Sequence, residues 1–346
     1  MNYYRQQHVP IFFFSCLGDH EKQVYDGNEA NLKSHYADCQ KNPGHLGFIP
    51  ISTFSISDLP VGHRDNDLYE LIKVTADLTV RINVTKVSHS RPEFWPNTDK
   101  PYPFRNQIGS TTARSGSGIV GVVKYIDGFE HDISRNIYNV LGHKPDTEYK
   151  TCPCDKCQNS DRPSNVWWEV FVHTATHVVF DEIEASHTSV RLFFDEDDSP
   201  LVTMDKLKVD YINIERDRCQ LKYITCDATL GNRLCTMDEH WFALRDKVLN
   251  SYTHRQENKL NFIVSHPHGC PKYVCIGQWT DNAQVAEFND DYDFTQLTYT
   301  TGTCPGSSGA MVHCVGFKGG HFHSGTLTSE LNYSCVGRFW KTSAAI

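Results

Sequence analysis

Short apolar runs separated by polar turns dominate the chain from about residue 105 onward. Three of these runs, at 115–123, 167–172 and 262–265, are rich in β-branched and aromatic residues. Gly, Asp, Asn and Pro cluster between the runs, as they do at turns between strands. This pattern predicts a mainly β structure of barrel type for residues 105–346.

One long helical pattern interrupts the predicted strands. Within 231–252, apolar residues recur at steps of three and four, at Leu234, Met237, Trp241, Leu244, Val248 and Leu249. This spacing places them on one face of a helix. We therefore expect a packed helix at about 231–252, with predicted strands before it at about 105–230 and after it at about 258–340.

The first 104 residues carry mixed signals. The stretches 20–42 and 65–74 are compatible with helices, and 78–87 alternates like a half-buried strand. Four prolines between 92 and 103 mark a linker. The sequence predicts an N-terminal α+β extension of unknown role, although its strand could instead pack on the first barrel.

Size and charge limit the classes of function. The chain has 346 residues, of which 39% are hydrophobic, and a net charge of −9. It is large enough for more than one barrel domain, and its acidity argues against nucleic acid as a partner. No apolar run has transmembrane length, and the run 11–14 is too short for a signal peptide. We expect an intracellular protein that has no membrane partner.

A serine lies between glycines near the C-terminus, in Thr-Cys-Pro-Gly-Ser-Ser-Gly at 303–309. Glycines allow the strained turn that presents a nucleophilic hydroxyl, here that of Ser308. The same turn can direct the N–H groups of Gly306 and Ser308 at one oxyanion. An ordinary β-turn is the alternative, because Gly/Ser turns are common.

A second segment makes a catalytic interpretation of this turn stronger. The apolar run from 167 ends in Thr-Ala-Thr-His, with His177 as its last residue. A histidine at a strand end can reach a cleft and act as a base. A lone histidine is more often structural, so the pairing with Ser308 carries this interpretation.

The segment around His177 resembles the histidine motif of chymotrypsin-like serine peptidases, and 306–310 resembles their serine motif. The Gly-Ser-Gly strand at 115–123 and the strand and Pro-x-Gly turn at 262–269 are similar to the HtrA-like branch of that family. The resemblance covers roughly residues 105–340. It implies a two-barrel fold and a Ser-His-Asp mechanism that needs no cofactor.

The family places an aspartate between the histidine and the serine in sequence. Asp217, followed by Arg-Cys-Gln-Leu, fits that pattern best, although two polar residues replace apolar ones. Asp227 and Asp210 are the alternatives. The carboxylate has to fix the tautomer of His177, and the sequence does not show which of the three does so.

Residues of the substrate pocket follow from the same resemblance. Thr303, His323 and Gly325 match positions that line the pocket in glutamyl endopeptidases and viral 3C-type peptidases. The match implies a preference for Glu or Gln on the acyl side of the cut bond. Gly302 stands where trypsin-like relatives carry the aspartate that binds Lys or Arg.

Cysteines suggest a further site outside the peptidase motifs. The chain has 13 cysteines, an odd number that argues against a fully paired disulfide framework. Cys152, Cys154 and Cys157 lie within six residues and could supply three ligands to a structural zinc ion. A local disulfide is the alternative.

Together these observations predict a serine endopeptidase that acts on polypeptides, with His177, Asp217 and Ser308 as its triad. A binding or scaffold protein on the same fold, inactive or cleaving only itself, is the alternative. In both cases we expect the N-terminal region to contact a protein partner that the sequence does not identify.

Overall fold

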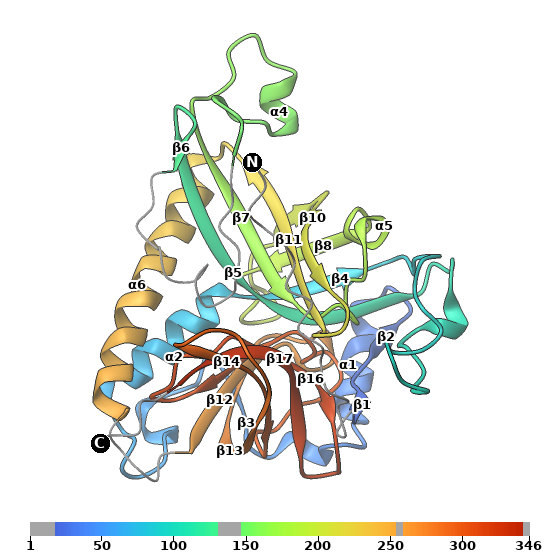
Figure 1. Cartoon of the computed structure of the whole chain (residues 1–346), viewed down its shortest axis with the longest axis vertical. Coiled ribbons are helices and arrows are strands. Elements are labelled where there is room, and N and C mark those ends of the chain that lie inside the picture. Colours follow the sequence, from blue (N-terminus) through green and yellow to red (C-terminus); the bar gives the residue numbers. More distant parts are fainter. Residues whose placement is uncertain (1–17, 131–146, 254–258, 342–346) are drawn as a thin grey trace.

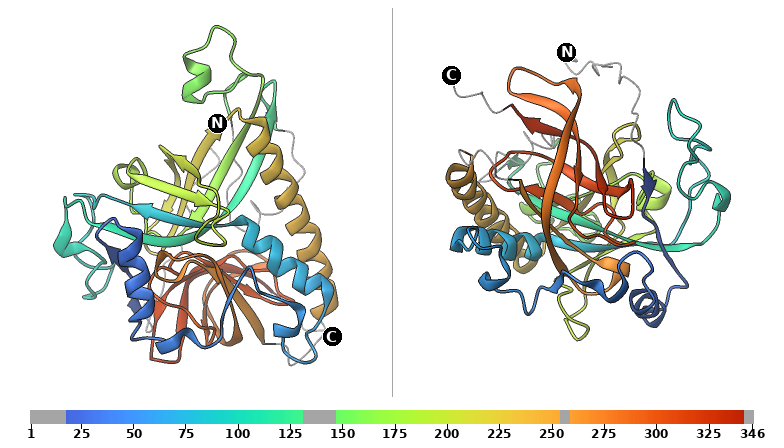
Figure 2. Two further views of the ribbon diagram at one scale, coloured as in Figure 1. Left: turned by 180° about the vertical axis from the view of Figure 1, so that it is seen from behind. Right: turned by 90° about the horizontal axis from the view of Figure 1, so that it is seen from below.

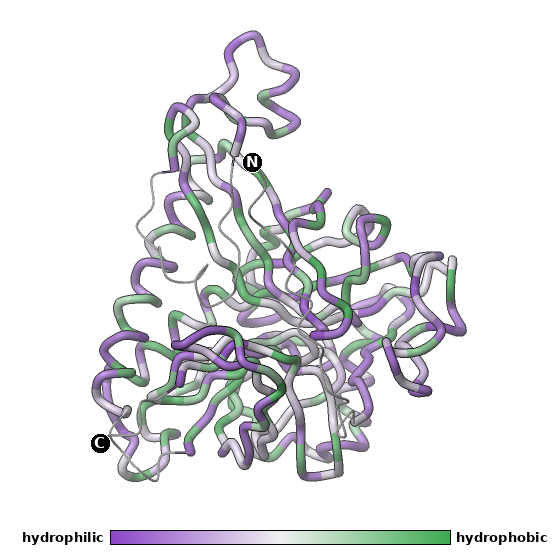
Figure 3. Tube along the Cα trace, viewed as in Figure 1, coloured by the Kyte–Doolittle hydropathy of each residue, from purple (hydrophilic) through white to green (hydrophobic). Residues whose placement is uncertain are grey.

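The computed structural model describes residues 18–130, 147–253 and 259–341, and its strands form two sheets beside one long helix (Figure 1). The predicted mainly β architecture is confirmed, with one closed barrel and one curled, open sheet. Apolar stretches concentrate in the sheets, whereas the excursion that carries α4 is largely polar (Figure 3).

Six strands of the C-terminal part close into a barrel, because β16 pairs with both β15 and β17. Around the barrel the order is β16-β15-β12-β13-β14-β17. Their bounds are β12 (Leu260–Ser265), β13 (Tyr273–Glu287), β14 (Tyr292–Tyr299), β15 (Met311–Cys314), β16 (His321–Thr326) and β17 (Asn332–Trp340). Two strands from the N-terminal region extend this sheet, β1 (Asp19–His20) on β16 and β3 (Phe48–Pro50) on β13.

The other sheet is called the first sheet below, because most of its strands precede the barrel in sequence. Its order is β10-β11-β7-β5-β4-β8-β9, and its end strands β10 and β9 do not pair with each other. Its strands are β4 (Thr79–Val84), β5 (Ala113–Ile126), β7 (Val166–Thr174), β8 (Thr188–Leu192), β9 (Val202–Asp205), β10 (Lys208–Asn213) and β11 (Arg218–Thr225). Two short strands, β2 (Gln23–Tyr25) and β6 (Phe129–Glu130), pair with β5.

The N-terminal region is built into both sheets and does not form a unit of its own. β4 lies in the middle of the first sheet, where it pairs with β5 and β8. Its residues Val80, Ile82 and Val84 are fully buried, so burial of their side chains holds the strand there. A boundary at residue 104 would therefore cut through a continuous sheet.

The two longest helices pack together on one side of the sheets, and the shorter ones lie in connections between strands (Figures 1 and 2). The α-helices are α1 (Glu29–Ala37), α2 (Asn66–Leu78), α4 (Asp155–Gln158), α5 (Glu182–Ala185) and α6 (Ala228–Tyr252). Short 3₁₀ turns occur at η1 (Pro43–His45), η2 (Ile56–Asp58), η3 (Arg105–Gln107) and η4 (Pro267–Gly269). From behind, α2 and α6 pack side by side across the junction of the two sheets (Figure 2).

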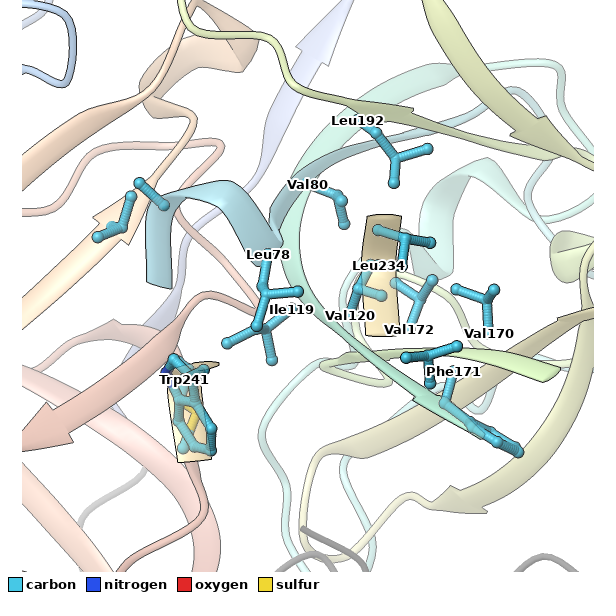
Figure 4. Packing of buried hydrophobic residues seen from close by; sticks show 14 of the residues in the cluster. Leu78, Val80, Ile119, Val120, Val170, Phe171, Val172, Leu192, Leu234 and Trp241 are labelled. Atoms are coloured by element: carbon cyan, nitrogen blue, oxygen red, sulfur yellow. The ribbon is translucent and has the colours of Figure 1, made fainter. Parts of the chain in front are cut away.

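The predicted connecting helix is α6, and Asp227 caps its start by accepting hydrogen bonds from the Thr229 and Leu230 N–H groups. Leu234 and Trp241 are fully buried and pack in the core that Figure 4 shows. The Trp241 indole N–H donates to Thr75 Oγ1 at 2.9 Å, so α6 and α2 are joined by a buried hydrogen bond. Among the described residues, no helix is both long and apolar enough to cross a membrane.

Candidate active site

The turn that follows β7 brings His177 against Asp217, which lies just before β11. Nδ1 of His177 is 2.8 Å from Oδ2 of Asp217. The other carboxylate oxygen accepts the backbone N–H of His177 at 3.0 Å and the hydroxyl of Thr176 at 2.9 Å. Asp217 has a positive φ of 53°, a conformation uncommon for a residue with a side chain, and these bonds hold it there.

The C-terminal barrel, called the second barrel below, also contacts this carboxylate. Ser324, on β16, donates its hydroxyl to Oδ2 of Asp217 at 2.7 Å. Burial alone would raise the pKa of Asp217, but the charge and hydrogen bond of His177, with help from His20 and Ser324, hold that pKa well below its ordinary value. An ionised carboxylate only accepts hydrogen bonds, so Nδ1 of His177 carries a proton. In neutral His177, Nε2 is then the basic nitrogen.

A buried ion network fixes the turn that carries His177. Glu184 accepts from Nε of Arg91 at 2.7 Å and also pairs with Arg114. Arg91 donates to the carbonyl oxygen of His177 at 3.1 Å, and Arg114 donates to that of Val178 at 2.9 Å. Breaking a buried pair of this kind typically costs about 3–5 kcal/mol. The backbone beside His177 is therefore held from two directions.

The two alternative aspartates have other roles in the structure. Asp227 caps α6, as described above. Asp210 accepts from the amide of Gln220 at 2.8 Å and lies 3.4 Å from Nζ of Lys222. Of the three candidates, Asp217 is the one whose carboxylate contacts the ring of His177.

The loop that carries Ser308 requires its glycines. Gly306 and Gly309 have φ angles of 97° and 85°. A Cβ atom on Gly306 would lie 2.6 Å from the carbonyl oxygen of His266, and one on Gly309 would lie 2.4 Å from that of Ser117. Both positions therefore demand glycine for conformation and for space.

The same loop orients two backbone N–H groups. The carbonyl of Pro305 accepts from His268 N–H, and the carbonyl of Ser307 accepts from Ala310 N–H. Each of these carbonyls shares a peptide unit with the next residue's N–H group. Because a trans peptide places C=O and N–H on opposite sides, the N–H groups of Gly306 and Ser308 point away from the Pro305 and Ser307 carbonyl oxygens. Within the described ranges, neither of these two N–H groups has a backbone acceptor.

A segment from the N-terminal region lies across Ser308, which the sequence analysis did not predict. Ser308 Oγ donates to the backbone carbonyl oxygen of Glu21 at 2.8 Å, and Glu21 N–H donates to the Ser324 carbonyl at 3.3 Å. The ring of His20 lies 4.8 Å from that of His177, centroid to centroid. Consecutive residues of one segment thus contact Ser308 and His177, so both face the same stretch of backbone.

The side chain of Glu21 fills a pocket lined by the predicted residues Thr303 and His323. Nε2 of His323 is 3.0 Å from Oε2 of Glu21, and the Thr303 hydroxyl is 3.3 Å from Oε1. The third predicted residue, Gly325, leaves room for the backbone of the segment, since a Cβ atom there would lie 1.9 Å from the Asp19 carbonyl oxygen.

Two further residues of this pocket were missed by the sequence analysis. Lys41 pairs with Oε1 of Glu21 and lies 3.0 Å from the Thr303 hydroxyl, and Thr326 donates to the same carboxylate oxygen at 2.9 Å. Burial alone would raise the pKa of Glu21, but the charges and hydrogen bonds of His323 and Lys41 hold it well below its ordinary value. The pocket is thus complementary to a carboxylate. No motif marks Lys41, which lies 262 residues from Thr303 in sequence.

Cys152, Cys154 and Cys157 lie in the polar segment at 147–165 that carries α4, called the polar insertion below. The predicted cluster gains a fourth member from outside this insertion. The sulfur atoms of Cys152, Cys154, Cys157 and Cys226 all lie within 4.8 Å of one another. Cys226 follows β11 immediately, so the cluster joins the polar insertion to the first sheet. The sulfurs of Cys154 and Cys226 are 3.7 Å apart.

No protein-family profile and no curated protein matches the sequence. Solved structures with a similar fold include the Rv3671c protease from M. tuberculosis in its active form, which is 11% identical with a TM-score of 0.35 and covers 77% of this chain and 78% of that one. The HtrA-type protease AlgW with tripeptide is 11% identical with a TM-score of 0.37, covering 77% of this chain and 58% of that chain. Both of these proteins are proteases.

Proposed function

We propose that the protein is a serine endopeptidase with Ser308 as nucleophile, His177 as general base and Asp217 as the residue that orients His177. One observation supports this above all: the Ser308 hydroxyl lies on a peptide carbonyl while the neighbouring residue of the same segment contacts the ring of His177. The hydrogen bond between Asp217 and Nδ1 of His177 supports the orienting role. Nε2 of His177 has no hydrogen-bond partner in the described part of the chain, because the Ser308 hydroxyl donates to Glu21 and not to this ring.

In this mechanism Nε2 of His177 takes the proton of Ser308 as Oγ attacks the carbonyl carbon. The oxyanion that forms is stabilised by the N–H groups of Gly306 and Ser308, whose orientation leaves them available. His177 then gives the proton to the leaving amine, and the peptide bond breaks to form an acyl-enzyme. Water, activated by the same nitrogen, releases the acid product and restores Ser308.

The alternative, an inactive scaffold protein, predicts that Ser308 is no more reactive than any other buried serine. Ser308 is only 2% exposed, because the N-terminal segment covers it. A fluorophosphonate probe therefore has to be applied to a Glu21→Ala chain, in which the main side-chain anchor of the segment is gone. Labelling of Ser308 in that chain would exclude the scaffold alternative.

In the Glu21→Ala chain, replacing the triad residues should remove hydrolysis of a fluorogenic peptide. We expect losses of roughly 10⁶-fold for Ser308→Ala and for His177→Ala, and roughly 10⁴-fold for Asp217→Asn, the sizes found for such triads in other peptidases. Asp210→Asn is the matched control and should leave kcat nearly unchanged. A large loss in that control, with Asp217→Asn active, would contradict the assignment.

We propose further that the enzyme prefers Glu over Gln on the acyl side of the cut bond. The sequence resemblance implied either residue, and Lys41 favours the charged one because a cation beside the carboxylate stabilises its ionised form. A neutral Gln would remove the opposite charge from the partly exposed Lys41 ammonium, which would keep its hydrogen bonds to Thr303 and Asn332. The expected preference for Glu is therefore the contribution of that one ion pair.

Substitutions in the pocket should lower cleavage after Glu without disabling Ser308. Charged hydrogen bonds contribute about 1.5–3 kcal/mol, so Lys41→Met and His323→Leu should each reduce kcat/KM for Glu peptides roughly 10- to 100-fold. Lys33→Met, which removes an exposed lysine paired with Asp197, is the control. Peptide-library profiling provides the measurement, and a profile dominated by Leu, Phe or Lys would refute the preference.

We also propose that Cys152, Cys154, Cys157 and Cys226 hold a structural zinc ion. Four sulfurs placed tetrahedrally at 2.3 Å from zinc would lie about 3.8 Å apart, and the Cys154–Cys226 separation is 3.7 Å. The ion would anchor the polar insertion to the first sheet. It has no part in the proposed chemistry, which needs no cofactor.

Removing one of these ligands should remove one zinc ion per chain. We expect Cys226→Ser to lose one equivalent in elemental analysis of protein purified without a histidine tag. Cys235→Ser, a half-buried cysteine outside the cluster, should keep it. An unchanged zinc content in Cys226→Ser, or an oxidised pair among the four thiols, would contradict the zinc site.

A further inference from the structure

The segment that crosses Ser308 pairs with a strand of each sheet, on either side of Glu21 and Lys22. On one side of Glu21, β1 pairs antiparallel with β16, with Asp19 opposite Thr326 and His20 opposite Gly325. On the other side, β2 pairs antiparallel with β5, with Gln23 opposite Ser115. Figure 1 shows β1 beside the second barrel and β2 beside the first sheet. The bond between Glu21 and Lys22 therefore lies where the segment passes between the two sheets.

Every part of Glu21 has a partner in the site. Its N–H donates to Ser324, its carbonyl oxygen accepts from Ser308, and its carboxylate meets His323, Thr326 and Lys41. Lys22, by contrast, is exposed. The N–H and the carboxylate of Glu21 are thus held in the site, its carbonyl oxygen lies on the Ser308 hydroxyl, and the residue on the amine side of the bond is exposed.

The same chain supplies both the segment and the pocket. Asn28 caps α1, and Glu29 at its start forms an ion pair with the buried Arg81 on β4. Lys41, which follows this helix, completes the pocket around Glu21. Residues 23–41 therefore join the pairing of β2 with the first sheet to the pocket that holds Glu21. This connection ties the segment to the Ser308 of its own chain.

We propose that the chain is its own substrate and cuts itself between Glu21 and Lys22. This inference rests on the proposed peptidase function. Ser308 Oγ bonds to the Glu21 carbonyl carbon, the C–N bond breaks, and the Lys22 amine leaves with the proton that His177 took from Ser308. One water molecule then hydrolyses the ester. The products are a carboxylate at Glu21 and a new N-terminus at Lys22, and the cleft opens to other substrates when the released piece leaves.

The test is the intact mass and the N-terminal sequence of the full chain after purification. We expect a new N-terminus at Lys22 in the wild type and an uncut chain for Ser308→Ala and for Glu21→Ala. Asp19→Asn is the matched control. It removes a negative charge from an exposed side chain two residues before Glu21, and the variant should still be cut. The uncut fraction should not depend on protein concentration, because the reaction is intramolecular.

Failure of this inference is distinguishable from failure of the proposed function. If the wild type stays uncut at Glu21 while the Glu21→Ala chain reacts with a fluorophosphonate probe, the segment is an inhibitory plug and self-cleavage is refuted. Cleavage at another bond, or equal cleavage of Glu21→Ala, would also overturn it. If neither chain hydrolyses peptides nor reacts with the probe, the peptidase function itself fails.

A second inference comes from an independent group of residues beside the pocket. Cys39, His45, His268 and Cys304 are all buried, and one ligand atom from each lies within 4.8 Å of the others. The sulfurs of Cys39 and Cys304 are 3.6 Å apart, close to the spacing of about 3.8 Å expected for two sulfurs on one zinc ion. No sequence motif marks this group, because its members come from three distant segments.

The surroundings of these four residues match those of metal ligands. Nε2 of His45 and Nε2 of His268 are buried without a hydrogen-bond partner in the described part of the chain. Nδ1 of His268 lies 2.8 Å from the Gln23 amide oxygen, so its proton is there and Nε2 is left as the ligand atom. Asn42 donates its side-chain N–H to Cys304 Sγ at 3.1 Å and its backbone N–H to Cys39 Sγ at 3.4 Å, as donors to a thiolate do.

We infer that these four residues form a second zinc site, of Cys₂His₂ type. Cys304 follows the pocket residue Thr303 and precedes the loop of Ser308, whereas Cys39 and His45 flank Lys41 in sequence. A bound ion would therefore fasten the N-terminal side of the pocket to the nucleophile loop. This role is structural and does not depend on the protein being active.

Metal content decides this inference. With the four-cysteine site also filled, the wild type should hold two zinc ions per chain, and Cys39→Ser and His45→Ala should each hold one. Cys275→Ser is the control, a buried cysteine of the same apolar cluster that is not among the four. Replacement of zinc by cobalt should give a thiolate-to-cobalt absorption that Cys39→Ser weakens.

Cobalt absorption and thiol analysis keep the inference testable if a variant does not fold. The second site would be overturned if the wild type held one zinc ion and the Cys226→Ser variant held none. A disulfide between Cys39 and Cys304, detected as the loss of two titratable thiols in unfolded wild-type protein, would also overturn it.

Discussion

The carboxylate of Asp217 is the interaction on which the arrangement of the site depends. It accepts hydrogen bonds from the turn after β7 in the first sheet and from Ser324 on β16 of the second barrel. A buried carboxylate is tolerated only when its oxygens are satisfied, so these partners have to stay in place together. One charge thus fixes both the ring of His177 and the strand along which the N-terminal segment pairs.

The sequence was sufficient for features that short motifs encode. The Gly-Ser-Ser-Gly loop, the histidine after β7 and the helix α6 follow from local spacing and turn chemistry. Strand patterns indicated the mainly β architecture, whereas its division into two parts was implied by the family resemblance. Asp217 was harder to identify, because three acidic residues competed. The structure distinguishes them by their contacts, since Asp227 caps a helix and Asp210 binds Gln220 and Lys222.

Features that depend on distant segments could not be predicted. Lys41 and Thr303 meet across 262 residues, and Cys226 joins a cluster whose other members lie about 70 residues earlier. The alternation at 78–87 left packing of β4 on the first sheet as one of two possibilities, but the N-terminal region carries no motif to indicate that Glu21 lies on Ser308. Periodicity indicates which side chains are buried, whereas only the tertiary fold decides which of them meet.

Under the proposed peptidase function, the way in which the pocket is assembled limits how specificity can diverge. Its lining comes from a loop after α1, from the approach to the nucleophile and from β16, and His323 is supported by the Tyr299 hydroxyl at 2.7 Å. Exchanging one lining residue leaves the others arranged around a carboxylate, so a single change weakens recognition without creating a new preference. A lineage that acquired a different preference would have to alter several distant segments together, and the bond that its own N-terminal segment presents would have to change with them.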